Sequence, residues 1–115
     1  MTTWLLDTHT WIWMASNPGL LPVGLKKAVQ ARKKPRLLLS LASIWELTIK
    51  QSLGRIELSI SVAEMARLSS AKLGTVTLPI EFRHLEVLAS LPLERHRDPF
   101  DRIVVAQAVS ESDLL

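Results

Sequence analysis

Short apolar runs alternate with helical patterns along this chain, and the alternation constrains the fold more than any other feature. The apolar runs span residues 3–6, 36–40 and 75–78. Apolar residues recur at helical spacing in residues 8–15, 20–34, 42–53, 61–73, 79–91 and 99–111. Buried apolar strands separated by helices are typical of parallel sheets. The pattern therefore predicts an α/β fold with a parallel sheet.

Capping signals mark several of the predicted helix ends. Glycines at 54 and 74 are expected to close two helices, and Ser61 with Glu64 has the spacing of a capping box. Two prolines, Pro79 and Pro99, stand where a helix is expected to begin, and Asp98 would be the N-cap before the second of them. No repeat or low-complexity linker divides the pattern, so we expect one domain spanning residues 1–115.

Composition limits the compartment and the kinds of site available. The chain has 115 residues, 48% of them hydrophobic, and no cysteine, which excludes disulfides and thiolate zinc sites. The N-terminus reaches Asp7 before any signal-like apolar stretch, and no segment is suited to crossing a membrane. We therefore expect a soluble cytoplasmic protein. A net charge of +3 is consistent with a polyanionic partner, and equally with an ordinary basic surface.

Three acids, Asp7, Glu46 and Asp101, each follow an apolar run or open an apolar-periodic helix. Strand ends and helix starts meet at one edge of a parallel sheet, so the three carboxylates are expected to converge there. Converging carboxylates repel one another unless a cation is present, and oxygen ligands favour Mg²⁺ or Mn²⁺. Such an ion activates water toward a phosphodiester without a protein nucleophile. The acids therefore indicate metal-dependent phosphodiester hydrolysis.

Each acid also has a purely structural explanation. Asp7 is placed to cap the helix after it, and Ser43 with Glu46 has capping-box spacing. Asp98 fits an N-cap, and Asp101 lies in a first helical turn, where acids favour the helix dipole. These explanations remain open beside the catalytic one.

Basic and aromatic residues give weaker signals. The densest basic cluster, residues 32–36, suits either an RNA backbone or a solvated helix end. Trp4 and Trp45 are expected in the core, whereas one of Trp11 and Trp13 is expected at an interface. An aspartyl phosphatase would carry a second aspartate two residues after the first, and His9 stands there instead.

Several segments together resemble the PIN-domain toxins of VapC type. They are residues 5–9 (LLDTH), 43–46 (SIWE) with Lys50, 54–56 (GRI), 96–102 (HRDPFDR) and 106–108 (AQA). The match in order and spacing covers essentially the whole chain, and HRDPFDR is its most specific piece. The resemblance implies a three-layer α/β/α domain around a central parallel sheet. It also implies a Mg²⁺- or Mn²⁺-dependent endoribonuclease that is dimeric and is held inactive by a cognate antitoxin.

Carried over to this chain, the resemblance assigns the metal-binding and catalytic acids to Asp7, Glu46 and Asp101. It gives supporting roles to Thr8, beside the first acid, and to Asp98. Four basic residues are candidates for contacts with RNA phosphates: Lys50, Arg55, Arg97 and Arg102.

The C-terminus departs from the family pattern. The family continues from a Leu-Leu-like strand start into a segment that brings a fourth acid and the last strand, whereas this sequence stops at Leu115. Asp113 precedes that strand and does not match the fourth acid. The resemblance therefore predicts a domain whose last strand is missing. The alternative function is that of a catalytically impaired PIN domain that only binds an antitoxin or another subunit.

Overall fold

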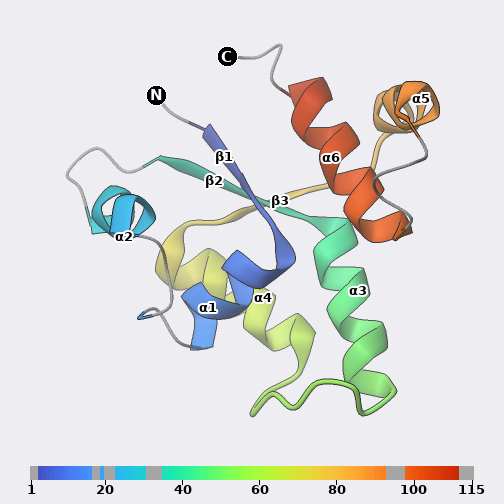
Figure 1. The fold of residues 1–115 in the computed structure, drawn as a ribbon. Coiled ribbons are helices and arrows are strands. Elements are labelled where there is room, and N and C mark those ends of the chain that lie inside the picture. Colours follow the sequence, from blue (N-terminus) through green and yellow to red (C-terminus); the bar gives the residue numbers. More distant parts are fainter. Residues whose placement is uncertain (1–2, 17–18, 20–22, 31–34, 93–97, 112–115) are drawn as a thin grey trace.

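The computed structural model describes residues 3–16, 19, 23–30, 35–92 and 98–111, which form a parallel sheet and six helices (Figure 1). The expected turn at residues 17–19, the basic residues 32–34 and the chain end at 112–115 lie wholly or largely outside these ranges. In chain order the elements are β1 (Thr3–Leu6), α1 (Thr8–Ser16), α2 (Val23–Gln30), β2 (Arg36–Ser40), α3 (Leu41–Ser52), α4 (Val62–Leu73), β3 (Val76–Leu78), α5 (Phe82–Ser90) and α6 (Pro99–Glu111).

All strand pairs are parallel, and β2 lies between β1 and β3. Leu6 of β1 pairs with Leu39 of β2, and Ser40 pairs with Leu78 of β3, so the three strands end at the same edge of the sheet. The predicted α/β fold with a parallel sheet is confirmed. This common edge is where α1 and α3 begin, directly after β1 and β2.

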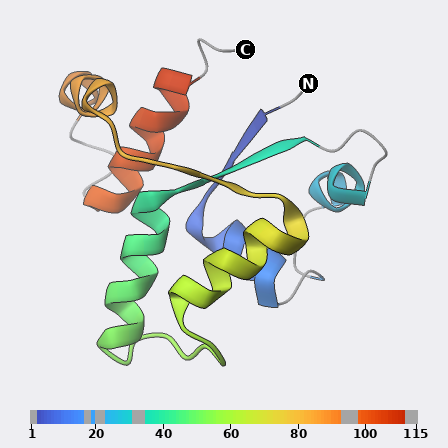
Figure 2. The same cartoon turned by 180° about the vertical axis from the view of Figure 1, so that it is seen from behind.

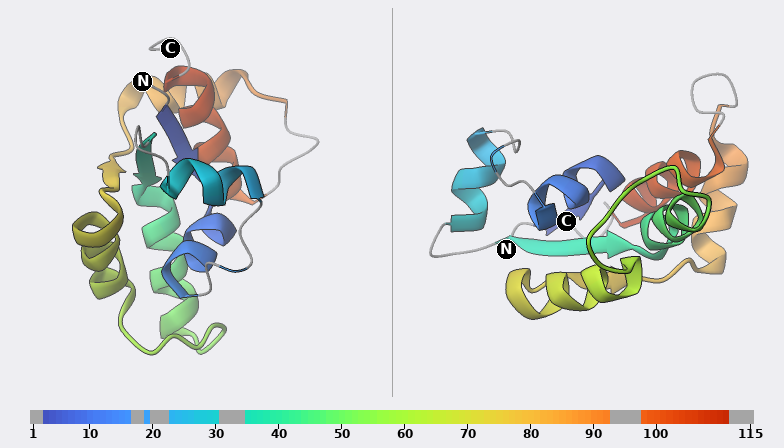
Figure 3. Two further views of the ribbon diagram at one scale, coloured as in Figure 1. Left: turned by 90° about the vertical axis from the view of Figure 1, so that its left-hand side faces the viewer. Right: turned by 90° about the horizontal axis from the view of Figure 1, so that it is seen from below.

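Helices cover both faces of the sheet. Seen from below, α1 and α2 lie on one side of the sheet and α4 lies on the other (Figure 3). The helices α5 and α6 lie side by side, and α6 also packs against α3 (Figure 2). This arrangement brings the N-terminal parts of three sequence-distant helices, α1, α3 and α6, to one region of the molecule.

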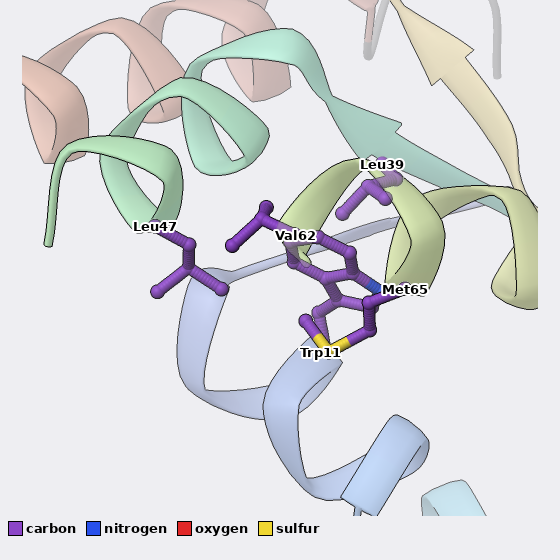
Figure 4. Packing of buried hydrophobic residues seen from close by; sticks show 5 residues of the cluster. All are labelled: Trp11, Leu39, Leu47, Val62 and Met65. Carbon is purple, nitrogen blue, oxygen red and sulfur yellow. The ribbon is translucent and has the colours of Figure 1, made fainter. Parts of the chain in front are cut away.

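The main core is built around Trp11, whose side chain is fully buried (Figure 4). It packs with Leu39, Leu47, Val62 and Met65, which come from β2, α3 and α4. The indole Nε1 donates a hydrogen bond of 2.9 Å to Ser69 Oγ on α4, so the one polar atom of this ring is satisfied. Trp11 thus joins α1 to the helix on the opposite face of the sheet.

Two smaller apolar clusters lie elsewhere in the described part of the chain. Leu6, Met14 and Leu37 pack together, with the partly buried Trp4 and Trp13 against them. A separate cluster of Ala42, Ile103 and Ala106 packs α6 onto the first turns of α3. The packing of α6 on α3 holds the helix that carries Asp101 beside the helix that carries Glu46.

Several predicted helix ends are confirmed. Ser61 Oγ accepts the N–H of Glu64 at 3.1 Å, and Gly54 and Gly74 have φ angles of 71° and 70° at the ends of α3 and α4. Only glycine adopts this left-handed conformation without strain. At the start of α6, Asp98 and Phe100 flank Pro99. Asp98 Oδ1 accepts the N–H of Phe100 at 2.8 Å.

One predicted cap and one predicted helix start are wrong. The N-cap of α3 is Ser40, not Ser43, because β2 turns into the helix without a linker and its last residue accepts the N–H of Ala42. Helix α5 begins at Phe82, so Pro79 lies before it; Glu81 and His84 form its capping box instead. The carbonyl of Pro79 accepts a hydrogen bond from Gln107 Nε2, which holds this residue in the connection.

The prediction for Trp45 is also wrong, because its side chain is 55% exposed. Its ring stacks edge-on against Phe100 of α6, with ring centroids 4.9 Å apart. Of the pair on α1, Trp11 is buried and Trp13 is half-buried, so the two rings enter two different clusters. No helix within the described ranges is long and apolar enough to span a membrane.

Candidate active site

Asp7 and Thr8 lie at the junction of β1 and α1. Asp7 is exposed, and its Oδ1 accepts the backbone N–H of Thr10 at 2.7 Å, which caps the helix. The capping role foreseen for Asp7 is therefore present. It uses one carboxylate oxygen and keeps the side chain at the edge where the strands end.

Glu46 is the central carboxylate of the site. It is buried in the second turn of α3, where Thr8 Oγ1 lies 2.9 Å from its Oε1. The same hydroxyl lies 3.1 Å from Ser43 Oγ. A threonine hydroxyl has a single proton, and a carboxylate only accepts. Thr8 therefore donates to Glu46, and Ser43 donates to Thr8. This chain of hydroxyls fixes the orientation of a buried carboxylate.

Lys50 supplies the counter-charge. Its Nζ lies 2.8 Å from Glu46 Oε2, one helical turn away on α3. The pKa of Lys50 is raised above its ordinary value, first by the hydrogen bond to Glu46 and then by the negative charges of Glu46, Asp98 and Asp101, against the opposing effect of burial. The charges of α3 and of the α6 N-terminus therefore converge on one ammonium group.

Asp98 and Asp101 stand at the start of α6. Asp98 Oδ1 accepts the N–H groups of Phe100 and Asp101, at 2.8 Å and 3.4 Å, so the N-cap function predicted for Asp98 is confirmed. Asp101 is exposed in the first turn. Packing of α6 on α3 and the contact between Phe100 and Trp45 hold this turn beside the helix of Glu46.

The three predicted acids differ in how directly the structure connects them. Glu46 and Thr8 are in contact, and the charge of Asp101 acts on the Lys50 ammonium. Asp7 is connected to Glu46 only through the next residue, Thr8, whose hydroxyl donates to Glu46. In the described ranges, no three His, Asp or Glu side chains are grouped closely enough to hold a metal ion.

The donor chemistry around Glu46 nevertheless fits a hard cation. Glu46 offers carboxylate oxygens and Thr8 a hydroxyl oxygen, which are ligand types that Mg²⁺ and Mn²⁺ prefer. The Lys50 ammonium now occupies one oxygen of Glu46, and the charges of Asp98 and Asp101 also act on this ammonium, so the negative field at this place attracts a positive group. Asp7, Glu46 and Asp101 are the residues that would hold such an ion.

The predicted phosphate contacts are placed differently from one another. Arg55 is exposed beyond the end of α3, where its N–H donates to the carbonyl of Lys50. Arg102 is half-buried on α6, and its Nε is buried without a hydrogen-bond partner in the structure. Arg97 and the neighbouring His96 lie outside the described residues.

Two contacts of the site were not predicted. Ser43, for which the sequence suggests a helix cap, hydrogen-bonds to Thr8 from inside α3 instead. Lys50 was interpreted as a phosphate contact, without its pairing to Glu46. The spacing of a glutamate four residues before a lysine on one helix was the available signal.

A comparison with protein families matches almost the whole chain to one family. The PIN domain model matches residues 4–115, which is nearly the whole chain. Searches among curated proteins and among solved structures returned no match. The chain therefore belongs to the PIN domain family, whose members are typically nucleases that use Mg²⁺ or Mn²⁺.

Proposed function

We propose that this protein is a Mg²⁺- or Mn²⁺-dependent endoribonuclease and the toxin component of a VapBC-type toxin–antitoxin system in the cytoplasm. The observation that carries the catalytic part is the buried Glu46 carboxylate, held by Thr8 and facing a positive charge on which Asp98 and Asp101 also act. The resemblance of LLDTH and HRDPFDR to VapC-type toxins supports the choice of RNA as the substrate.

In this proposal Asp7, Glu46 and Asp101 are the catalytic residues and hold the ion. When bound, Mg²⁺ or Mn²⁺ supplies a polarised phosphate, an activated water and charge stabilisation of the leaving oxygen. Thr8 donates to Glu46 Oε1 and so presents the other carboxylate oxygen in a fixed direction. Asp98 holds the first turn of α6 in place and adds negative charge that favours the cation.

Basic residues near the site guide the substrate. Lys50 and Arg102 lie on the two helices that carry the second and third acids, and Arg55 follows the first of these helices. Together with Arg97 they would contact RNA phosphates, in keeping with the net charge of +3. These contacts position the backbone and do not select a base sequence.

The toxin function implies two protein partners, which are a second copy of the chain and a cognate antitoxin. An exposed apolar stripe on α3 supports association with protein. Its members recur every four residues, so they share one helix face: Leu41, Trp45, Ile49 and Leu53, the last of them the C-cap. The same stripe favours the alternative function, a PIN domain that is impaired in catalysis and acts only as a binding module.

An RNA cleavage assay separates the two functions. The purified chain is incubated with a mixed-sequence RNA and with DNA of the same sequence, in Mn²⁺ and in EDTA. The proposal expects internal cuts in RNA that require Mn²⁺, with DNA left intact. A folded chain that cuts neither polymer would contradict the nuclease assignment and favour the binding module. Cleavage of DNA at the same rate would contradict the choice of RNA.

A further inference from the structure

Both oxygens of the Glu46 carboxylate already have partners from the chain itself. Oε1 accepts from Thr8 and Oε2 accepts from Lys50, at 2.9 Å and 2.8 Å. The Glu46 side chain is only 7% exposed, so an unpaired charge there would be costly. Lys50 and Thr8 together satisfy this carboxylate in the absence of any ion.

Lys50 is positioned to compete with a metal cation for Glu46 Oε2. An ion bound to Glu46 Oε2 would lie at about 2.1 Å from that oxygen, while the ammonium lies 2.8 Å from the same atom. Two positive charges that share one carboxylate oxygen repel each other strongly in a partly buried site. Glu46 therefore has room for one of the two partners on this oxygen at a time.

The Lys50 side chain can also move away from Glu46. Its side chain is 42% exposed, in contrast to that of Glu46, and it carries a flexible four-carbon stem. The pair is of the i, i+4 type on α3, so breaking it requires rotation of side-chain bonds and no movement of the helix. Release of the ammonium into solvent is thus mechanically easy.

We propose that Lys50 is a tethered counter-ion that closes Glu46 in the metal-free chain and competes with the divalent cation, so that Lys50 sets the metal affinity of the site. This inference rests on the proposed function, because it concerns the same ion. The competition gives Lys50 two positions. It pairs with Glu46 when the ion is absent, and it is freed toward the RNA phosphates when the ion is present.

Mn²⁺ binding, followed by the loss of the free-ion signal in electron paramagnetic resonance, tests the competition without any RNA. Lys50→Met removes the charge and retains most of the stem. It is expected to bind Mn²⁺ about tenfold more tightly than the wild type, the order expected for removing one nearby like charge. Lys50→Gln serves as the second variant, since its amide still donates to Glu46 and keeps the carboxylate hydrogen-bonded.

Two matched variants control for charge. Lys72→Met on α4 changes the net charge equally, away from Glu46, and its Mn²⁺ affinity is expected to equal that of the wild type. Lys50→Arg keeps the positive charge and is also expected to bind as the wild type does. The inference is supported if Lys50→Met and Lys50→Gln bind Mn²⁺ more tightly than the wild type and the two control variants do not. This holds also if the wild type binds too weakly to measure.

Failure of the inference and failure of the function give different results. If the wild type binds Mn²⁺ and both neutral variants bind equally or more weakly, the competition is overturned while the metal site remains. If neither the wild type nor the folded neutral variants bind Mn²⁺, the metal site itself is overturned, and the inference with it.

Discussion

Ser40 Oγ donates a hydrogen bond of 2.5 Å to Gln107 Oε1, which joins the last residue of β2 to the middle of α6. Both side chains are fully buried. The same hydroxyl accepts the N–H of Ala42 and caps α3. One serine therefore fixes the start of the helix that carries Glu46 and the position of the helix that carries Asp101.

Replacement of this serine is expected to lower stability more than loss of a cap alone. Ser40→Ala removes the cap and leaves the buried Gln107 oxygen unpaired, which together should lower the free energy of unfolding by about 2–3 kcal/mol. Ser61→Ala on α4 removes only an exposed cap and should cost about 1 kcal/mol. Urea denaturation of both variants gives the comparison. Equal losses would contradict a structural link between β2 and α6.

The hydroxyl of Thr8 is expected to matter for catalysis through Glu46. Thr8→Val keeps the shape and removes the donor to Glu46 Oε1, so kcat/KM for RNA should fall on the order of tenfold, the size of one hydrogen bond to a charged group. Thr8→Ser keeps the hydroxyl and should retain most of the activity. Full activity of the valine variant would remove Thr8 from the site.

The pairing of Lys50 with Glu46 predicts a stability change at high pH. The folded-state pKa of Lys50 is raised above 10.5, so the stabilisation is complete below about that pH and is lost as pH rises through the folded-state value. At pH 8 the wild type should exceed Lys50→Met in free energy of unfolding by about 1 kcal/mol, because the ammonium is partly exposed and screened while the carboxylate that it pairs with is buried.

Denaturation at increasing pH measures this difference directly. It should shrink above pH 10.5, whereas Lys50→Arg should keep its pairing, because a guanidinium stays protonated there. A difference between wild type and Lys50→Met that stays constant to pH 12 would show that the charge of Lys50 does not stabilise the fold.

The apolar stripe on α3 predicts self-association. Trp45→Glu places a charge in the middle of the stripe and should abolish a dimer that forms through it, as measured by analytical ultracentrifugation. Because Trp45 is 55% exposed, the main cost to stability is its edge contact with Phe100, about 1 kcal/mol. Phe82→Glu on α5, at a side chain that is 78% exposed, is the matched control. Identical association of both variants would place any dimer interface elsewhere.

Local signals predicted most of the fold. The strands at residues 3–6 and 36–40 and the helix from Pro99 to Glu111 are as expected, because apolar runs and the Asp98 cap act over a few residues. The start of α5 was missed because the carbonyl of Pro79 is held by Gln107, which is distant in sequence. Trp45 was placed in the core because large aromatic residues are usually buried, and the sequence does not reveal that its helix face lacks a covering element within the described chain.

The sequence singles out the candidate acids by local features, whereas the long-range contacts of Glu46 depend on the fold. Asp7, Glu46 and Asp101 are candidates because they follow a strand or lie in early helix turns, which are local properties. The hydrogen bonds from Thr8 to Glu46 and from Ser43 to Thr8 join residues 38 and 35 positions apart, and they depend on how α1 packs against α3. The caps formed by Asp7 and Asp98, and the pair of Glu46 with Lys50, follow instead from spacing over a few residues.

The most direct test of the account is Mn²⁺-dependent RNA cleavage by Asp7→Asn compared with the wild type. Asparagine caps helices as well as aspartate does, so the hydrogen bond to Thr10 and the melting temperature should be nearly unchanged. The loss of the charge should lower the cleavage rate by at least about a hundredfold, since a carboxylate ligand of the ion is removed. Cleavage by Asp7→Asn at the wild-type rate would contradict a metal-dependent nuclease centred on these acids.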